Sequence, residues 1–140
     1  NSRLDTIQAA VGLEMIKKIN LITNKRISNA KYLNSKLKNI DEIKLIHEQK
    51  NYKSVFHLYQ FFCKKRNALN SFLRKNKIDS KIHYSKPLHL HKAAKKFWYK
   101  KGDFPFAENL SRQVISIPIH EFIKKKDLDF IIKKVLEFYN

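Results

Sequence analysis

The sequence predicts an α+β domain in which a small antiparallel sheet is packed with helices. Three observations lead to this fold class. Apolar residues recur at helical spacing near both ends of the chain, short β-branched and aromatic runs lie between them, and 43% of the 140 residues are hydrophobic. The chain has no internal repeat, low-complexity tract or Gly/Ser linker, so we expect residues 1–140 to form a single domain.

The first part of the chain has the pattern of two consecutive helices. We expect the first to begin near Ser2, which is a candidate N-cap. Its apolar residues recur at the spacing of one helical stripe, namely at Leu4, Ile7, Val11, Met15, Ile19 and Ile22. Because Met15 is on this stripe, we expect it in the core. A bend is predicted within residues 20–24, and the second helix should stop around Asn39.

Runs of β-branched and aromatic residues predict the strands. Ile43–Glu48 is short and partly alternating, whereas Val55–Phe62 is long and aromatic, as expected for a central strand. The polar residues 49–53 between them suit a hairpin connection. Val114–Ile117 is a third strand, and a further short strand is predicted at Asp79–Ile82.

Helical spacing returns in the second half of the chain. It marks Arg66–Lys75, a segment that begins at Pro105, and a strongly amphipathic C-terminal helix over Lys126–Tyr139. A short helix is also predicted over His91–Tyr99. Since Pro87 disfavours helical backbone at the residue before it, we expect residues 83–89 to form an extended loop.

The net charge of +18 has two interpretations. Clustered lysines release counterions from phosphate groups, which would suit a nucleic-acid binder. Lysine can also serve only as a solubilising surface residue. The chain has just five arginines, although planar contacts with phosphate favour arginine, and its lysines are spread along the whole sequence. We therefore favour surface lysine, and keep a basic nucleic-acid-binding or interaction module as the alternative function.

Several classes of site and location are disfavoured. No apolar run approaches the roughly 18 residues of a membrane span, and the N-terminus lacks a signal pattern, so we expect a cytoplasmic protein without a membrane partner. The histidines show no zinc-ligand spacing, and we expect no metal site. The single cysteine, Cys63, is predicted to be an inert buried thiol at the end of a strand.

Two pairs of polar aromatic residues are candidates for contact with a ligand. His57 and Tyr59 share one face of the predicted central strand, because side chains alternate there. His83 and Tyr84 precede the proline-bearing loop, and loop residues often contact ligands. For both pairs, simple packing is an equally open interpretation of the residues alone.

Six short motifs follow one another along the chain. They are Asn1-Ser2-Arg3-Leu4-Asp5-x-Ile7-Gln8-Ala9-Ala10, Val55-Phe56-His57-Leu58-Tyr59, Arg66-x-x-Leu69, Ile82-His83-Tyr84-x-x-Pro87-Leu88-His89, Phe104-Pro105-x-Ala107-Glu108 and Ser116-Ile117-Pro118-Ile119. In this order they resemble the C-terminal part of the DegT/StrS-type sugar aminotransferases, the pyridoxal-phosphate enzymes that act on nucleotide-linked keto-sugars. The resemblance extends over essentially the whole chain.

The resemblance implies a fold-type-I aminotransferase whose active site lies at a homodimer interface. Asn1 stands where such enzymes have an asparagine that reaches the cofactor phosphate of the neighbouring subunit, and a helix start favours an anion. His83 and Tyr84 inherit a role in substrate binding, with His57 as a lesser candidate. Glu108 is expected to support the fold rather than to transfer protons.

In this family the lysine that binds the cofactor belongs to a large N-terminal domain, which we expect this chain to lack. No residue is therefore assigned a catalytic role. The parent reaction implied by the resemblance moves an amino group from an amino acid, typically glutamate, to a nucleotide-linked keto-sugar for polysaccharide or antibiotic biosynthesis. We expect this chain alone neither to transaminate nor to bind pyridoxal phosphate. The family's usual glycine before Ile78 is replaced by Lys77, so the turn there is expected to differ.

Overall fold

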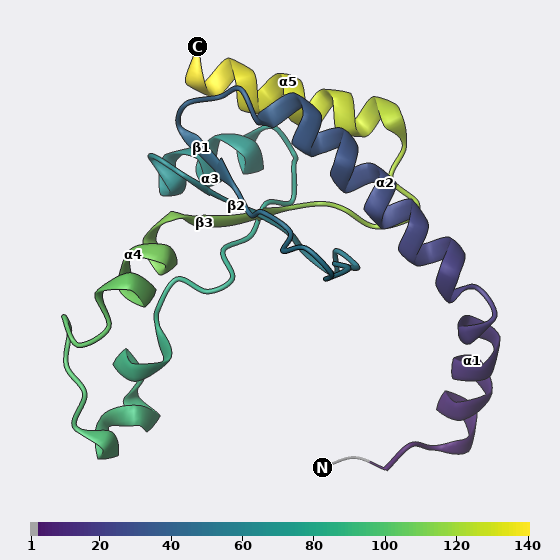
Figure 1. The fold of residues 1–140 in the computed structure, drawn as a ribbon, viewed down its shortest axis with the longest axis horizontal. Helices are drawn as coiled ribbons and strands as arrows, with labels where there is room; N and C mark the ends of the chain where they lie inside the picture. The colour runs from purple at the N-terminus through teal and green to yellow at the C-terminus, as the bar shows by residue number, and fades with distance from the viewer. Residues whose placement is uncertain (1–2) are drawn as a thin grey trace.

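A three-stranded antiparallel sheet lies at the centre of the computed structural model, which describes residues 3–140 (Figure 1). The strands are β1 (Ile43–Leu45), β2 (Tyr59–Cys63) and β3 (Val114–Ile117), in the order β1-β2-β3. In the register, Phe61 of the central strand lies between Leu45 and Ile115. The predicted α+β fold with a small antiparallel sheet is confirmed.

Helices cover one face of this sheet and extend beyond it on two sides. The longer elements are α1 (Thr6–Ile16), α2 (Ile19–Leu37), α3 (Arg66–Lys75), α4 (Pro105–Gln113) and α5 (Lys125–Tyr139), and the 3₁₀ turns are η1 (Leu88–Leu90) and η2 (Lys92–Phe97). Figure 1 shows α2 and α5 side by side, with α1 and α4 projecting away from them. Within residues 3–140, no helix has both the length and the apolar character needed to cross a bilayer.

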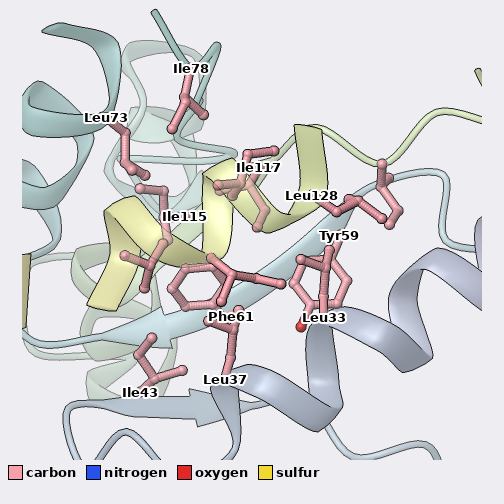
Figure 2. Close-up of a cluster of buried hydrophobic side chains, with 14 of the residues drawn as sticks. Leu33, Leu37, Ile43, Tyr59, Phe61, Leu73, Ile78, Ile115, Ile117 and Leu128 are labelled. Atoms are coloured by element: carbon pink, nitrogen blue, oxygen red, sulfur yellow. The ribbon is translucent and has the colours of Figure 1, made fainter. Parts of the chain in front are cut away.

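The hydrophobic core lies between the sheet and three of these helices. Alternation along β2 directs Tyr59, Phe61 and Cys63 toward the helices, where all three are buried. Leu33 and Leu37 of α2 pack against Tyr59 and Phe61, as Figure 2 shows. The helices contribute nine residues to this cluster, namely Ala30, Leu33 and Leu37 of α2, Leu69 and Leu73 of α3, and Leu128, Ile131, Ile132 and Val135 of α5.

The opposite face of the sheet carries a different set of side chains. Gln60 lies directly across from Ser116, and Phe62 lies across from Val114. At the free edge of β3, Lys81 exchanges two backbone hydrogen bonds with Ser116, at 2.8 and 3.0 Å. The predicted strand at Asp79–Ile82 is thus reduced to one isolated bridge, and this bridge places the next residues of the chain beside the sheet.

The N-terminal helix differs from the expectation. Asp5 is its N-cap, with a reciprocal capping box to Gln8, and the helix breaks near Lys17, before the predicted bend. None of the residues in α1 is buried, and Met15 is 48% exposed. The assignment of Met15 to the core was therefore wrong, because α1 extends away from the sheet (Figure 1) and its apolar stripe is not buried. Ser2 lies outside the described residues.

The central strand is also shorter than predicted, and this changes the environment of His57. Phe56 has a left-handed backbone with φ of 49°, and β2 begins only at Tyr59. His57 and Tyr59 consequently do not share a strand face. Tyr59 is buried on the helical side, where its hydroxyl donates to Asn34 Oδ1 at 2.7 Å, whereas His57 is exposed in a bend.

Other predictions agree closely with the structure. The helix Arg66–Lys75 and the strand Val114–Ile117 have the predicted bounds, and the C-terminal helix begins one residue earlier, at Lys125. Cys63 is the last residue of β2 and is 3% exposed, and burial raises the pKa of its thiol. These features agree with the predicted inert thiol at a strand end.

Candidate functional site

Two hollows adjoin the sheet face opposite to α2, α3 and α5, and His83 borders both of them. The first, the polar hollow, has mainly polar lining residues and a volume of about 260 Å³. Its walls come from α2, the bend before β2, the segment beside the free edge of β3, and the residues after β3. Its main polar side chains are Arg26, His57, Asp79, Lys81, His83, Ser116 and His120.

The second hollow is larger and mainly apolar, with a volume of about 840 Å³. It lies between the sheet face and the segment that runs through η1, η2 and α4. Phe62 and Val114 of the sheet form one wall. The opposite wall includes Tyr84, Leu88, Phe97, Tyr99 and Phe104.

The structure brings the predicted substrate-side residues to these hollows. His57 and His83 both line the polar hollow, although they are 26 positions apart in sequence. Tyr84 lines the apolar hollow and is 77% exposed. The fourth predicted residue, Asn1, lies outside the described residues.

His83 is held by two polar side chains from the open sheet face. Its Nδ1 is 3.0 Å from Ser116 Oγ, and its backbone carbonyl accepts a hydrogen bond of 3.1 Å from Gln60 Nε2. The same Gln60 nitrogen lies 3.2 Å from Ser116 Oγ. The ring therefore has a fixed position at the boundary between the two hollows.

Arg26 of α2 was not identified from the sequence, yet it organises the polar hollow. Its guanidinium pairs with Glu121 at 2.9 Å and donates to the backbone carbonyls of Phe56 and His57, each at 3.3 Å. It thus ties the bend that carries His57 to the loop that follows β3. Arg26 is one of only five arginines in a lysine-rich chain, which was the one sequence signal that could have drawn attention to it.

A buried hydrogen bond between two side chains supports the wall of the apolar hollow. His89 Nε2 lies 3.0 Å from Glu108 Oε1, and each side chain is 8% exposed. The same oxygen accepts a hydrogen bond of 2.7 Å from the backbone N–H of Gly102. The pKa of Glu108 is below its usual range, mainly because the carboxylate accepts a hydrogen bond from the Gly102 N–H and also because it interacts with His89. Glu108 thus has the predicted architectural role, since it joins η1, the turn before α4, and α4.

The lysines do not suit covalent binding of a carbonyl cofactor. A lysine that forms an imine at neutral pH is normally desolvated in a pocket or placed beside another cation. All lysines of this chain fall within residues 3–140, and all are exposed except Lys134, which is half-buried and pairs with Glu137 at 2.8 Å. Within the same residues no group of three or more metal-ligating side chains occurs.

Comparison with known proteins gives a consistent result over the whole chain. The model of the DegT/DnrJ/EryC1/StrS aminotransferase family matches residues 1–136. A pleiotropic regulatory protein of Geobacillus stearothermophilus is 30% identical over 99% of this chain and 38% of its own length. The dTDP-3-amino-3,4,6-trideoxy-alpha-D-glucose transaminase of Streptomyces venezuelae is 31% identical, over 99% of this chain and 36% of its own length. The chain therefore spans little more than a third of either relative.

Solved structures give the same answer for the fold. DesV of S. venezuelae, in complex with a ketimine intermediate, superposes with a TM-score of 0.95 at 31% identity, over 100% of this chain and 38% of that one. An aminotransferase from Brucella abortus has a TM-score of 0.91 at 34% identity, over 100% and 37%. The putative sugar aminotransferase Spr1654 from Streptococcus pneumoniae, in its PLP form, has a TM-score of 0.82 at 25% identity, over 91% and 33%.

Proposed function

Because the chain belongs to the DegT/DnrJ/EryC1/StrS aminotransferase family, we propose that it is the C-terminal small domain of a sugar aminotransferase. The parent enzyme would transfer an amino group from an amino acid to a nucleotide-linked keto-sugar. Three of the similar proteins are named or described as transaminases or aminotransferases, and one of these names specifies a dTDP-linked sugar. Amino-sugar synthesis for polysaccharides or antibiotics is the proposed context.

The arrangement of His57, His83 and Tyr84 carries this proposal. Imidazole and phenol groups can donate hydrogen bonds to the hydroxyl and phosphate oxygens of a nucleotide sugar. Arg26 and Lys81 also lie at the polar hollow, where their N–H groups can donate hydrogen bonds to the diphosphate of such a substrate. Glu121 pairs with Arg26, and Asp79 pairs with Lys81 at 3.1 Å, so these four groups add no net charge to the hollow.

Pyridoxal phosphate is the proposed cofactor of the parent enzyme, where it would supply the electron sink for amino transfer. The exposed lysines of this chain do not fit the imine-forming role, so we propose that this lysine lies in a part of the protein beyond these 140 residues. Asn1 remains the proposed contact to the cofactor phosphate. A homodimer with a shared active site remains the proposed assembly.

The substrate proposal can be tested on the chain itself by nuclear magnetic resonance. Titration with dTDP-glucose should shift the imidazole signals of His57 and His83, and leave that of His47 unchanged. His47 is an exposed histidine that lines neither hollow, so His47→Ala is the matched control for His83→Ala. His83→Ala should weaken the affinity, and His47→Ala should not. Equal losses from both variants, or no shift at millimolar ligand, would refute the assignment.

The catalytic proposal is tested together with the large domain of a similar enzyme. A chimera can supply it if this chain replaces the equivalent third of the Streptomyces venezuelae transaminase, which it matches over 138 residues. We expect the chimera to retain transaminase activity, with a higher KM in the His83→Ala version. A folded, cofactor-loaded chimera without any activity would contradict the proposal.

A further inference from the structure

Gln60, Ser116 and His83 form a short chain of hydrogen bonds whose direction can be worked out from donors and acceptors. The inference rests on the proposed substrate-side role of His83, and concerns two residues to which the sequence assigned no role of their own. Gln60 and Ser116 lie opposite each other on β2 and β3, on the sheet face that borders both hollows. The backbone bridge between Ser116 and Lys81 places His83 within reach of them.

The orientation of the Gln60 amide follows from its contact with a carbonyl. The carbonyl oxygen of His83 can only accept a hydrogen bond, so the Gln60 atom 3.1 Å away must be the amide nitrogen. That NH₂ group has a second hydrogen, and Ser116 Oγ lies 3.2 Å from the nitrogen. Gln60 is therefore a donor to Ser116.

The direction of the next hydrogen bond follows from this one. Ser116 is 4% exposed, so solvent has little access to its hydroxyl. The hydroxyl accepts from Gln60 and keeps one proton to donate. His83 Nδ1, at 3.0 Å, can receive that proton as an acceptor. If His83 Nδ1 carried the proton instead, the Ser116 hydroxyl would accept hydrogen bonds from both Gln60 and His83. Its own proton would then have no acceptor among the described side chains, which is unfavourable for a buried group.

We propose that Gln60 and Ser116 are positioning residues that hold neutral His83 in the tautomer with its proton on Nε2. With Nδ1 occupied as an acceptor, the ring presents an N–H donor through Nε2. His83 would then bind an oxygen of the substrate, either a sugar hydroxyl or a phosphate, by donating a hydrogen bond. It would not act as a general base through Nε2, because that nitrogen already carries a proton.

The tautomer of His83 can be measured directly in this chain without any ligand. Long-range proton–nitrogen correlation spectra distinguish a protonated ring nitrogen from a bare one, and the spectrum of His83→Asn identifies the His83 signals. In the neutral ring we expect a protonated Nε2 and a bare Nδ1. A protonated Nδ1 in the native chain would overturn the proposal.

Two variants test whether Gln60 and Ser116 cause this state. In Gln60→Glu the carboxylate can only accept, so the Ser116 proton should turn toward residue 60 and His83 should shift to the Nδ1–H tautomer. In Ser116→Ala, His83 should lose its preference for the Nε2–H tautomer and populate a mixture of the two neutral tautomers. Ser111→Ala removes a buried hydroxyl that donates to the Glu108 carbonyl instead, and should leave the His83 spectrum unchanged. An unchanged tautomer in both folded test variants would refute the relay.

These measurements separate the relay from the proposed function. If the tautomer is as expected and dTDP-glucose leaves the His83 signals unperturbed, the substrate proposal fails and the relay remains. If the ligand shifts His83 but the native chain has the other tautomer, the substrate site remains and the relay is wrong. A merely structural role for Ser116 would lower stability without a change of tautomer.

Discussion

Lys77 follows the C-cap of α3 and has a left-handed backbone conformation, which glycine adopts at a lower energetic cost. Its φ is 61°, and the N–H groups of Lys77 and Ile78 donate to the carbonyls of Arg74 and Leu73, the pattern of a Schellman motif. Ile78 and Leu73 also pack together in the core, as this motif favours. The lysine that replaces the expected glycine thus occupies a left-handed turn.

Lys77→Gly should therefore stabilise the chain. Removal of the side chain relieves the left-handed strain, for a gain of about 0.5–1 kcal/mol in the free energy of unfolding. Urea denaturation followed by circular dichroism would measure it. Lys77→Ala is the matched control, since it removes the same charge and keeps a Cβ, and it should give no comparable gain. A loss of stability in Lys77→Gly would mean that the lysine makes a favourable contact that outweighs the strain.

Glu108 should make part of the stability depend on pH. Its pKa is lowered in the folded chain by the Gly102 N–H and by His89, so the folded state favours the carboxylate. This contribution is present above the unfolded pKa of about 4.3 and is lost as the pH falls through the lower folded value. Glu108→Gln should thus be less stable than the native chain at pH 7, and the difference should shrink below about pH 4.

Thermal unfolding of both proteins across this pH range would check the Glu108 prediction. Glu48→Gln is the control, because Glu48 is exposed on the segment after β1. It should follow the native chain at every pH. If the stability difference between Glu108→Gln and the native chain stayed constant from pH 3 to 7, the charge of the Glu108 carboxylate would not be what stabilises the fold.

At the scale of elements, α1 contributes no buried residue, whereas β3 is buried along its whole length. Ile7 of α1 is 76% exposed, and Ile115 of β3 is fully buried between the sheet and the helices. These two isoleucines offer a matched comparison, since the same atoms are removed from each by substitution with alanine.

Ile115→Ala should cost about 2–5 kcal/mol of unfolding free energy, because it removes buried methyl groups and leaves a cavity. Ile7→Ala should change it by less than about 0.5 kcal/mol, since the side chain is already in water and alanine favours the helix. Chemical denaturation of both variants would measure the difference. Similar losses from both would mean that α1 packs against another surface in solution.

At the scale of the whole molecule, the distribution of lysines limits what the chain can do with pyridoxal phosphate. The side chains carry most of the +18 net charge but lie in water rather than in a desolvated pocket. Lysines outside a desolvated pocket lack the activation that imine formation with an aldehyde normally needs.

We therefore expect no stable one-to-one covalent adduct between pyridoxal phosphate and the native chain. Borohydride reduction followed by peptide mass spectrometry should find low labelling spread over many lysines. The urea-unfolded chain is the control and should give a similar pattern. Stoichiometric labelling of one lysine, only in the folded chain, would contradict the proposal that the imine-forming lysine lies elsewhere.

Much of the fold could be predicted because the local patterns are strong. The helix at Arg66–Lys75 and the strand at Val114–Ile117 have clear periodicity and β-branched composition. The errors occurred where periodicity does not specify a partner. The apolar stripe that includes Met15 predicts a buried face, but no other described element covers it. Phe56 has a left-handed backbone near the start of an aromatic run, so β2 begins only at Tyr59, although by composition the strand would begin at Val55.

The sequence by itself determined the α+β class, most helices and strands, and the family resemblance that pointed to His57, His83 and Tyr84. Local periodicity and short motifs are sufficient for these, because they depend on neighbouring residues. Only the tertiary structure decided that Arg26 ties the His57 bend to the loop after β3, and that Gln60 and Ser116 hold His83. These contacts join residues more than 20 positions apart, and their geometry depends on strand register and on one backbone bridge.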